Sequence, residues 1–158
     1  MSQHATRPLP TTFDTPTAGE VLAAHLDVRL AAEPELQSRI GIIRDAFGGR
    51  IAFSSSLGVE DQAVLHAIAD ARADIDVFTL DTGRHFAETL ETLDATERRY
   101  GRRIRLIAPA AEATEALVAR DGVLGFRLSL ENRKTCCDVR KVQPLRRALE
   151  GAAGWITG

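Results

Sequence analysis

Several kinds of residue and pattern are scarce in this chain, and each scarcity excludes a class of protein. The only two cysteines are adjacent, at Cys136 and Cys137, so the spaced pairs of a secreted disulfide framework are missing. No apolar run approaches the roughly 20 residues of a membrane span, and the N-terminus has no signal-peptide pattern. A net charge of −2 gives no reason to expect a nucleic-acid partner. The expected location is therefore the cytoplasm, where thiols stay reduced.

Composition predicts one folded domain after a short polar segment. Hydrophobic residues make up 44% of the chain and charged residues 27%, which is typical of a globular protein. Residues 1–17 are polar and contain three of the six prolines, so we interpret them as a flexible tail. The domain is expected to run from residue 18 to residue 158.

Helical and strand-like patterns alternate along this domain. Apolar spacing predicts helices over 18–30, 33–47, 60–71, 86–100, 110–120 and 142–149. Short apolar runs predict strands over 50–54, 75–80, 103–107 and 154–157, whereas 132–137 is assigned no more than a helical turn. The alternation predicts an α/β fold, a Rossmann-like parallel sheet covered by helices. The sequence stops at the last predicted strand, before a covering helix, and we expect the C-terminal part of the domain to be absent.

Two loops at predicted strand ends carry polar residues suited to a nucleotide. The triple serine at 54–56 offers hydroxyls and backbone N–H groups to an anion, although an ordinary capped turn also explains serines there. In residues 81–84, Asp81 and Thr82 could contact a ribose or an adenine edge, and Arg84 an anion, with a capped turn as the simpler alternative. Ligands of parallel sheets bind beyond the carboxyl ends of the strands, so the two loops are expected side by side.

A third element combines thiols with positive charge. Residues 126–147 contain seven basic and two acidic side chains, and the cysteine pair lies within this segment. Nearby cations stabilise thiolates, so the pair could ligate a metal or cluster; two incidental free thiols on a basic helix are the alternative. Phe53 and Trp155 are interpreted as core residues.

Taken in order, these elements resemble the adenylyl-sulfate and phosphoadenylyl-sulfate reductases of sulfate assimilation. The matching segments are 53–62, 80–84 with Phe86 and 88–89, Cys136-Cys137 with 140–142 and 144–145, and 155–158. The resemblance implies a fold of the adenine nucleotide alpha hydrolase-like group. It also implies reduction of adenosine 5′-phosphosulfate to sulfite and AMP, with thioredoxin as the electron donor.

The resemblance also assigns roles to individual residues. Substrate binding is implied for Ser54, Ser55, Ser56, Leu80, Asp81, Thr82, Gly83, Arg140 and Lys141. Cys136 and Cys137 match half of the ligand set of a [4Fe–4S] cluster, whose other half is a later Cys-x-x-Cys. The pair favours adenylyl sulfate over its 3′-phosphorylated form. The family's nucleophilic cysteine also lies further along the chain, so no catalytic residue is assigned, and these 158 residues alone are expected not to turn over.

Several alternatives stay open. A phosphoadenylyl-sulfate reductase would share the fold and loops, and a non-catalytic nucleotide-binding module would need no nucleophile. An ATP pyrophosphatase-type enzyme would carry a glycine-rich loop ending in Asp-Ser, whereas Gln62 follows Asp61 here. The sequence does not decide the oligomeric state, so a homo-oligomer is also open.

Overall fold

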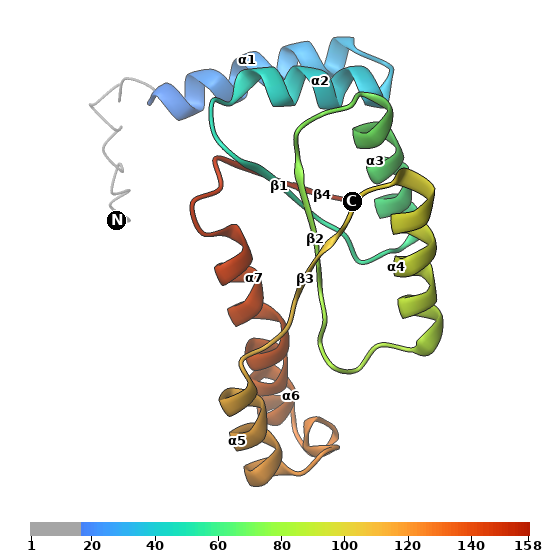
Figure 1. Ribbon diagram of the computed structural model, residues 1–158. Coiled ribbons are helices and arrows are strands. Elements are labelled where there is room, and N and C mark those ends of the chain that lie inside the picture. The colour runs from blue at the N-terminus through green and yellow to red at the C-terminus, as the bar shows by residue number, and fades with distance from the viewer. Residues whose placement is uncertain (1–16) are drawn as a thin grey trace, which may run out of the picture.

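The computed structural model describes residues 17–158, which form a parallel sheet of four strands flanked by helices (Figure 1). The strands are β1 (Ile51–Ser54), β2 (Asp76–Leu80), β3 (Arg105–Ile107) and β4 (Gly154–Thr157), in the order β3-β2-β1-β4. All three strand pairs are parallel, and Ala52 is in register with both Asp76 and Trp155. The predicted α/β class and parallel sheet are confirmed.

Helices account for most of the remaining described residues. They are α1 (Ala18–Ala32), α2 (Leu36–Ala46), α3 (Val59–Asp70), α4 (Ala87–Tyr100), α5 (Ala111–Asp121), α6 (Leu130–Cys137) and α7 (Gln143–Leu149). The predicted tail lies outside the described residues except for Thr17, which caps α1 in a capping box with Glu20. None of the described helices combines the length and apolar character that crossing a membrane requires.

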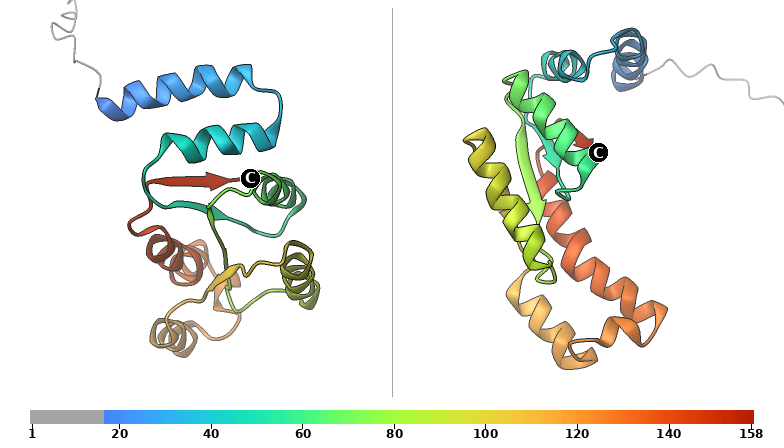
Figure 2. Two further views of the ribbon diagram at one scale, coloured as in Figure 1. Left: turned by 45° about the horizontal axis from the view of Figure 1, so that its top comes forward. Right: turned by 90° about the vertical axis from the view of Figure 1, so that its right-hand side faces the viewer.

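Both faces of the sheet are covered, as the two views in Figure 2 show: α3 and α4 lie on one side and α7 on the other. Alternate residues of β1 separate accordingly. Ile51 and Phe53 join the larger core with residues of α2 and α3, whereas Ala52 packs with Phe78 and Ala148 on the α7 side. Because β1 is central and buried on both faces, it reads as a continuous apolar run.

The segment from α5 to α7 is more helical than the sequence predicted. A short 3-10 turn (Gly125–Arg127) precedes α6, and a π-helical turn (Asp138–Val142) joins α6 to α7. The expected isolated turn at 132–137 is therefore part of a longer, nearly continuous helical run. Pro144 lies in the first turn of α7, where its missing N–H is tolerated. A π turn inserts one extra residue and changes which side chains face one direction.

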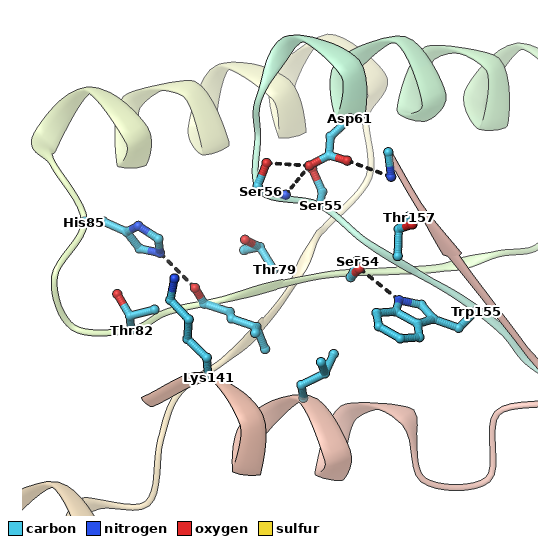
Figure 3. A pocket seen from close by; sticks show the side chains of 13 residues that line it. Ser54, Ser55, Ser56, Asp61, Thr79, Thr82, His85, Lys141, Trp155 and Thr157 are labelled. Atoms are coloured by element: carbon cyan, nitrogen blue, oxygen red, sulfur yellow. Dashed lines mark hydrogen bonds between the residues drawn. The ribbon is translucent and has the colours of Figure 1, made fainter. Parts of the chain in front are cut away.

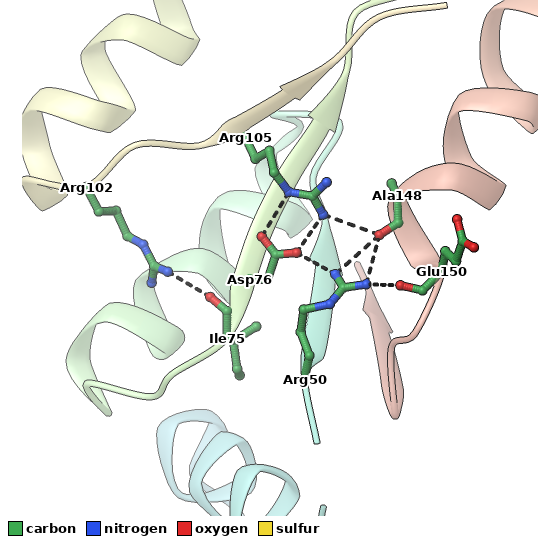
Figure 4. Close-up of polar contacts among 7 residues, drawn as sticks. All are labelled: Arg50, Ile75, Asp76, Arg102, Arg105, Ala148 and Glu150. Carbon is green, nitrogen blue, oxygen red and sulfur yellow. Dashed lines mark hydrogen bonds and ion pairs between the residues drawn. The ribbon is translucent and has the colours of Figure 1, made fainter. Parts of the chain in front are cut away.

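A partly exposed network of ion pairs and hydrogen bonds joins the amino ends of the strands (Figure 4). Asp76 accepts hydrogen bonds from Arg50 at 2.6 Å and from Arg105 at 2.6 Å. Both arginines also donate to the carbonyl oxygen of Ala148, and Arg50 donates to that of Glu150 at 2.6 Å. The network joins the starts of β1, β2 and β3 to the end of α7, at the edge opposite the polar loops.

Candidate functional site

A cavity of about 360 Å³ opens at the carboxyl ends of the strands (Figure 3). Its walls come from the loop after β1, the loop after β2, the end of β4 and the π turn before α7. The lining residues are Ser54, Ser55, Ser56, Asp61, Thr79, Leu80, Thr82, His85, Lys141, Leu145, Trp155, Thr157 and Gly158. The two polar loops predicted to meet at this edge therefore do so.

The triple serine forms a turn whose hydroxyls are already engaged. Ser54 Oγ accepts from Trp155 Nε1 at 2.9 Å, and Ser55 Oγ accepts from the N–H of Leu57 at 3.0 Å. Ser56 Oγ donates to Asp61 at 2.6 Å and accepts from the N–H of Gly58 at 3.3 Å. Leu57 adopts a positive φ of 66° to make the turn. The hydroxyls thus build the loop, and a ligand would meet their remaining hydrogen-bonding capacity.

The loop after β2 is a tight turn in which the predicted residues have different positions. Asp81 accepts from the N–H of Gly83 at 2.8 Å, and Gly83 has a positive φ of 66°, which glycine adopts without strain. Leu80 and Thr82 line the cavity, whereas Asp81 and Gly83 shape the turn. Arg84 is held away from it, since its guanidinium lies 4.9 Å from the Phe126 ring centroid and donates to the carbonyl of Val123.

Three cavity residues were not identified from the sequence. His85 lines the cavity and places Nε2 at 2.8 Å from the Leu80 carbonyl oxygen, which requires the proton on Nε2. Asp61 is buried beside the serine loop. Trp155, interpreted as core, is 50% exposed, and its ring borders the cavity. That interpretation was wrong because β4 lies at the edge of the sheet, where alternate side chains stay uncovered.

A second cavity of about 830 Å³ shares Thr82 and Lys141 with the first and is lined by both cysteines. Cys136 is half-buried and Cys137 exposed, at the last turn of α6. The side chains that line it include five cations and no carboxylate: Arg84, Arg127, Arg133, Arg140 and Lys141. Such a lining favours an anionic occupant, as the basic segment indicated.

Arg140 is a buried cation in the wall of the second cavity. It is 7% exposed, donates from Nη1 to the Thr82 carbonyl at 2.7 Å, and leaves Nε without a partner among the described residues. Lys141, the next residue of the π turn, is exposed and lines both cavities, as does Thr82. The π turn thus places two successive cations differently: Arg140 lines the second cavity alone, and Lys141 lines both.

The cysteine pair fits half of an iron–sulfur site. Two adjacent thiols beside five cations suit an anionic thiolate-ligated cluster. Within residues 17–158, no group of three or more His, Cys, Asp or Glu side chains is arranged to hold a metal ion. Cys136 and Cys137 can therefore supply two thiolates, and a four-iron cluster needs further ligands from elsewhere.

Comparison with known protein families finds a match over most of the chain. Residues 50–158 match the phosphoadenosine phosphosulfate reductase domain. The matched residues include the four strands, both polar loops and the cysteine pair.

Similar proteins and a similar structure agree with that match. Proteins named adenosine 5′-phosphosulfate reductase from Agrobacterium fabrum, Rhizobium meliloti and Allochromatium vinosum are 47%, 46% and 44% identical over 85%, 78% and 84% of the chain. The alignments cover 51%, 46% and 50% of those proteins, so the chain spans about half their length. A phosphoadenylyl-sulfate reductase from Candida auris, solved as a phosphate complex, has the same fold, with a TM-score of 0.72 at 18% identity over 90% of this chain and 68% of that one.

Proposed function

The chain belongs to the phosphoadenosine phosphosulfate reductase domain family, and from this membership we propose that it forms the nucleotide-binding part of an adenylyl-sulfate reductase. The proposed substrate is adenosine 5′-phosphosulfate, bound in the cavity at the carboxyl ends of the strands. The proposed products of the whole enzyme are sulfite and AMP.

The observation that carries this proposal is the shared wall of the two cavities. Thr82 and Lys141 line both the serine-walled cavity and the cavity that contains Cys136 and Cys137. A nucleotide seated over the strand ends can therefore direct its sulfate toward the sulfurs. An exposed lysine at that junction would reduce the repulsion between an anionic substrate and thiolates.

The proposed reaction is a thiol-dependent transfer that conserves atoms and electrons. A cysteine thiolate attacks the sulfur of the sulfate, the bond from sulfur to the phosphate oxygen breaks, and AMP leaves with that electron pair. The resulting cysteine S-sulfonate is cleaved by a thiolate of thioredoxin, which releases sulfite and forms a mixed disulfide that the second thioredoxin thiol resolves. Thioredoxin is oxidised and the sulfur is reduced. The attacking cysteine is assigned to a part of the enzyme beyond these residues, as the family resemblance implies.

Substrate binding is proposed for the nine residues that the resemblance implied, with roles refined by their positions. The serines, Leu80 and Thr82 border the nucleotide cavity, and Lys141 meets the sulfate. Asp81 and Gly83 shape the turn. Arg140 contributes its buried charge from behind Thr82.

A [4Fe–4S] cluster is the proposed cofactor, held in part by Cys136 and Cys137. Bound beside Lys141, it would supply a compact charged redox group near the sulfate. Free thiols and a thioredoxin-linked reaction fit a reducing compartment, and the cytoplasm is the proposed location.

Calorimetric titration of the purified chain with adenylyl sulfate, its 3′-phosphorylated form, AMP and ATP tests the proposal. We expect adenylyl sulfate to bind more tightly than the other three. Preference for the 3′-phosphorylated form would make the protein a phosphoadenylyl-sulfate reductase. Preference for ATP would contradict the proposal, and equal affinity for all four nucleotides would favour a non-catalytic nucleotide-binding module.

A further inference from the structure

A buried carboxylate connects the ends of two strands beside the nucleotide cavity. Asp61, the third residue of α3, is 7% exposed. Its Oδ2 accepts the N–H of Ser56 at 2.5 Å and the hydroxyl of Ser56 at 2.6 Å, and its Oδ1 accepts the N–H of Gly158 at 3.1 Å. Figure 3 shows the carboxylate between the serine loop after β1 and the end of the strand β4.

No ion pair among the described residues includes this carboxylate, so its negative charge is compensated by hydrogen bonds and by the dipole of its helix. Three donors surround the two oxygens. The N-terminal turn of α3 adds the favourable end of the helix dipole. A buried charge that is not compensated is costly, so these donors and the carboxylate fix one another's positions.

Gly158 fits this arrangement because it has no side chain. A Cβ built on Gly158 would overlap Oδ1 of Asp61 and would lie 3.1 Å from the backbone nitrogen of Asp61. The end of β4 can approach the carboxylate only as glycine. The close approach to Asp61 therefore depends on glycine at position 158.

We propose that Asp61 is a positioning residue for nucleotide binding, acting through Ser56 and Gly158. Its carboxylate fixes the serine loop to the end of β4, and so sets the distance between two walls of the cavity. The inference rests on the proposed function only for the identity of the nucleotide. Loss of the carboxylate should leave the fold intact, because Asp61 is not part of either hydrophobic core.

The first test measures the link without any ligand. Amide hydrogen exchange is followed by NMR in the wild-type chain and in Asp61→Asn. The asparagine NH₂ group cannot accept a hydrogen bond, so the variant loses the acceptor for either Ser56 or Gly158. We expect exchange at Ser56 or Gly158 to accelerate at least about tenfold while exchange within β1 and β2 stays unchanged. Unchanged exchange at both amides would overturn the proposal.

A matched control is available one residue earlier. Glu60 is exposed in the same first turn of α3 and does not line the cavity. Glu60→Gln removes the same charge near the same helix end, so it reports the effect of charge alone. Exchange at Ser56 and Gly158 should stay within about twofold of wild type in this variant.

The second test measures nucleotide affinity. If wild type binds adenylyl sulfate, Asp61→Asn should raise its Kd at least about tenfold and Glu60→Gln should not. Equal affinities of wild type and Asp61→Asn would overturn the inference and leave the proposed function intact. A wild-type chain that binds no adenylyl nucleotide would contradict the proposed function, and the exchange test would still decide whether Asp61 fixes the loop.

A second pair of variants guards against misfolding. Gly158→Ala should accelerate exchange at Ser56 as Asp61→Asn does, because the added methyl displaces the carboxylate. In an Asp61→Ala background the same change should add little further effect, since the overlapping oxygen is gone. Additive effects of the two changes would overturn the proposal. An Asp61→Asn chain that does not fold would also overturn it, because Asp61 would then be needed for the fold itself and not only for the position of the serine loop.

Discussion

Among the described residues, Lys141 is the one lysine or arginine whose side chain lines both cavities, which suits a charge-based role at their junction. Lys141→Ala should weaken binding of adenylyl sulfate about tenfold and of AMP much less, because only the sulfate extends toward this residue. Calorimetry with both ligands measures the difference. Arg146→Ala is the control, since Arg146 is exposed on α7 and lines neither cavity. Equal losses for the two ligands would show that Lys141 does not meet the sulfate.

Trp155 supports the serine loop by a single hydrogen bond to Ser54. Trp155→Phe keeps an apolar ring but removes the donor, so we expect the Kd for adenylyl sulfate to rise about three- to tenfold. The melting temperature should change little because the indole is half-exposed. Calorimetry and thermal unfolding measure the two quantities. A large fall in melting temperature with unchanged affinity would mean that the ring is a structural residue.

For single residues, the sequence predicted which residue types take part in the site better than it predicted their contacts. The serines and Thr82 were identified because their types and positions suit a nucleotide, Lys141 was implied by the family resemblance, and all of them line one cavity. Asp61 and His85 received no role, since their contacts with Gly158 and the Leu80 carbonyl depend on the folded chain. His66 lies in the helix predicted over 60–71, and its side chain is exposed. Helical spacing alone does not tell which apolar face becomes buried.

Among the secondary-structure elements, strand ends and the π turn determine the site. The strands and most helices were predicted within a few residues, because buried strands and amphipathic helices have strong periodic signals. The π turn at Asp138–Val142 was not predicted, since no residue pattern signals an i to i+5 turn. That turn places Arg140 behind Thr82 and leaves Lys141 in the cavities. The relation between the cysteine pair and the nucleotide loops thus required the structure.

The ion network at the amino ends of the strands makes a prediction about acid stability. Burial alone would raise the pKa of Asp76, but hydrogen bonds and charges from Arg105 and Arg50 outweigh it and hold the pKa of Asp76 below its ordinary value. A lowered folded-state pKa adds stability that is present above the unfolded pKa, near 3.9, and is lost as pH falls through the folded value. The network should therefore stabilise the fold at neutral pH and fail in acid.

Asp76→Asn should lower the free energy of unfolding at pH 7 by about 1 kcal/mol, since the partners are partly exposed and solvent screens them. The difference from wild type should shrink as pH falls below about 4, because the carboxylate of the unfolded chain is protonated first, and it should vanish once the folded carboxylate is protonated as well. Urea unfolding at pH 7 and at pH 3 measures both. Asp94→Asn, which alters an exposed pair with Arg98, should change stability far less. A difference that is independent of pH would contradict the electrostatic explanation.

For the whole molecule, the ligand count limits what the chain can hold. Two cysteines can supply at most two of the four thiolates that a four-iron cluster needs, and the described residues contain no group of three or more His, Cys, Asp or Glu side chains that could hold a metal ion. The 158-residue chain, purified without oxygen, is expected to contain far less than four iron atoms per chain. Iron and acid-labile sulfide assays with the absorbance near ~400 nm measure this. Four irons per chain would contradict the ligand assignment, and two irons per chain in a dimer would show a cluster shared between copies.

The fold class and the order of the elements were predictable from the sequence because they depend on local pattern and on general rules for parallel sheets. The cavities were not, because they depend on which loops the sheet order brings together. The order β3-β2-β1-β4 places the loop after β1 between the loop after β2 and the end of β4, so three segments distant in sequence line one cavity. The family resemblance implied which residues bind substrate, and the structure shows that some of them line the cavity at the strand ends whereas others shape the turn beside it.

In the proposed complex, a sulfated adenosine lies across the strand ends with its sulfate directed at the cavity lined by Cys136 and Cys137. A crystal structure of the chain with adenylyl sulfate tests this most directly. We expect the nucleotide to lie between the serine loop and the Leu80–Thr82 turn, with a sulfate oxygen within hydrogen-bonding distance of Lys141. Adenylyl sulfate bound at the arginine-rich edge around Arg50 and Arg105, or seated over the strand ends with its sulfate turned away from Cys136 and Cys137, would contradict it.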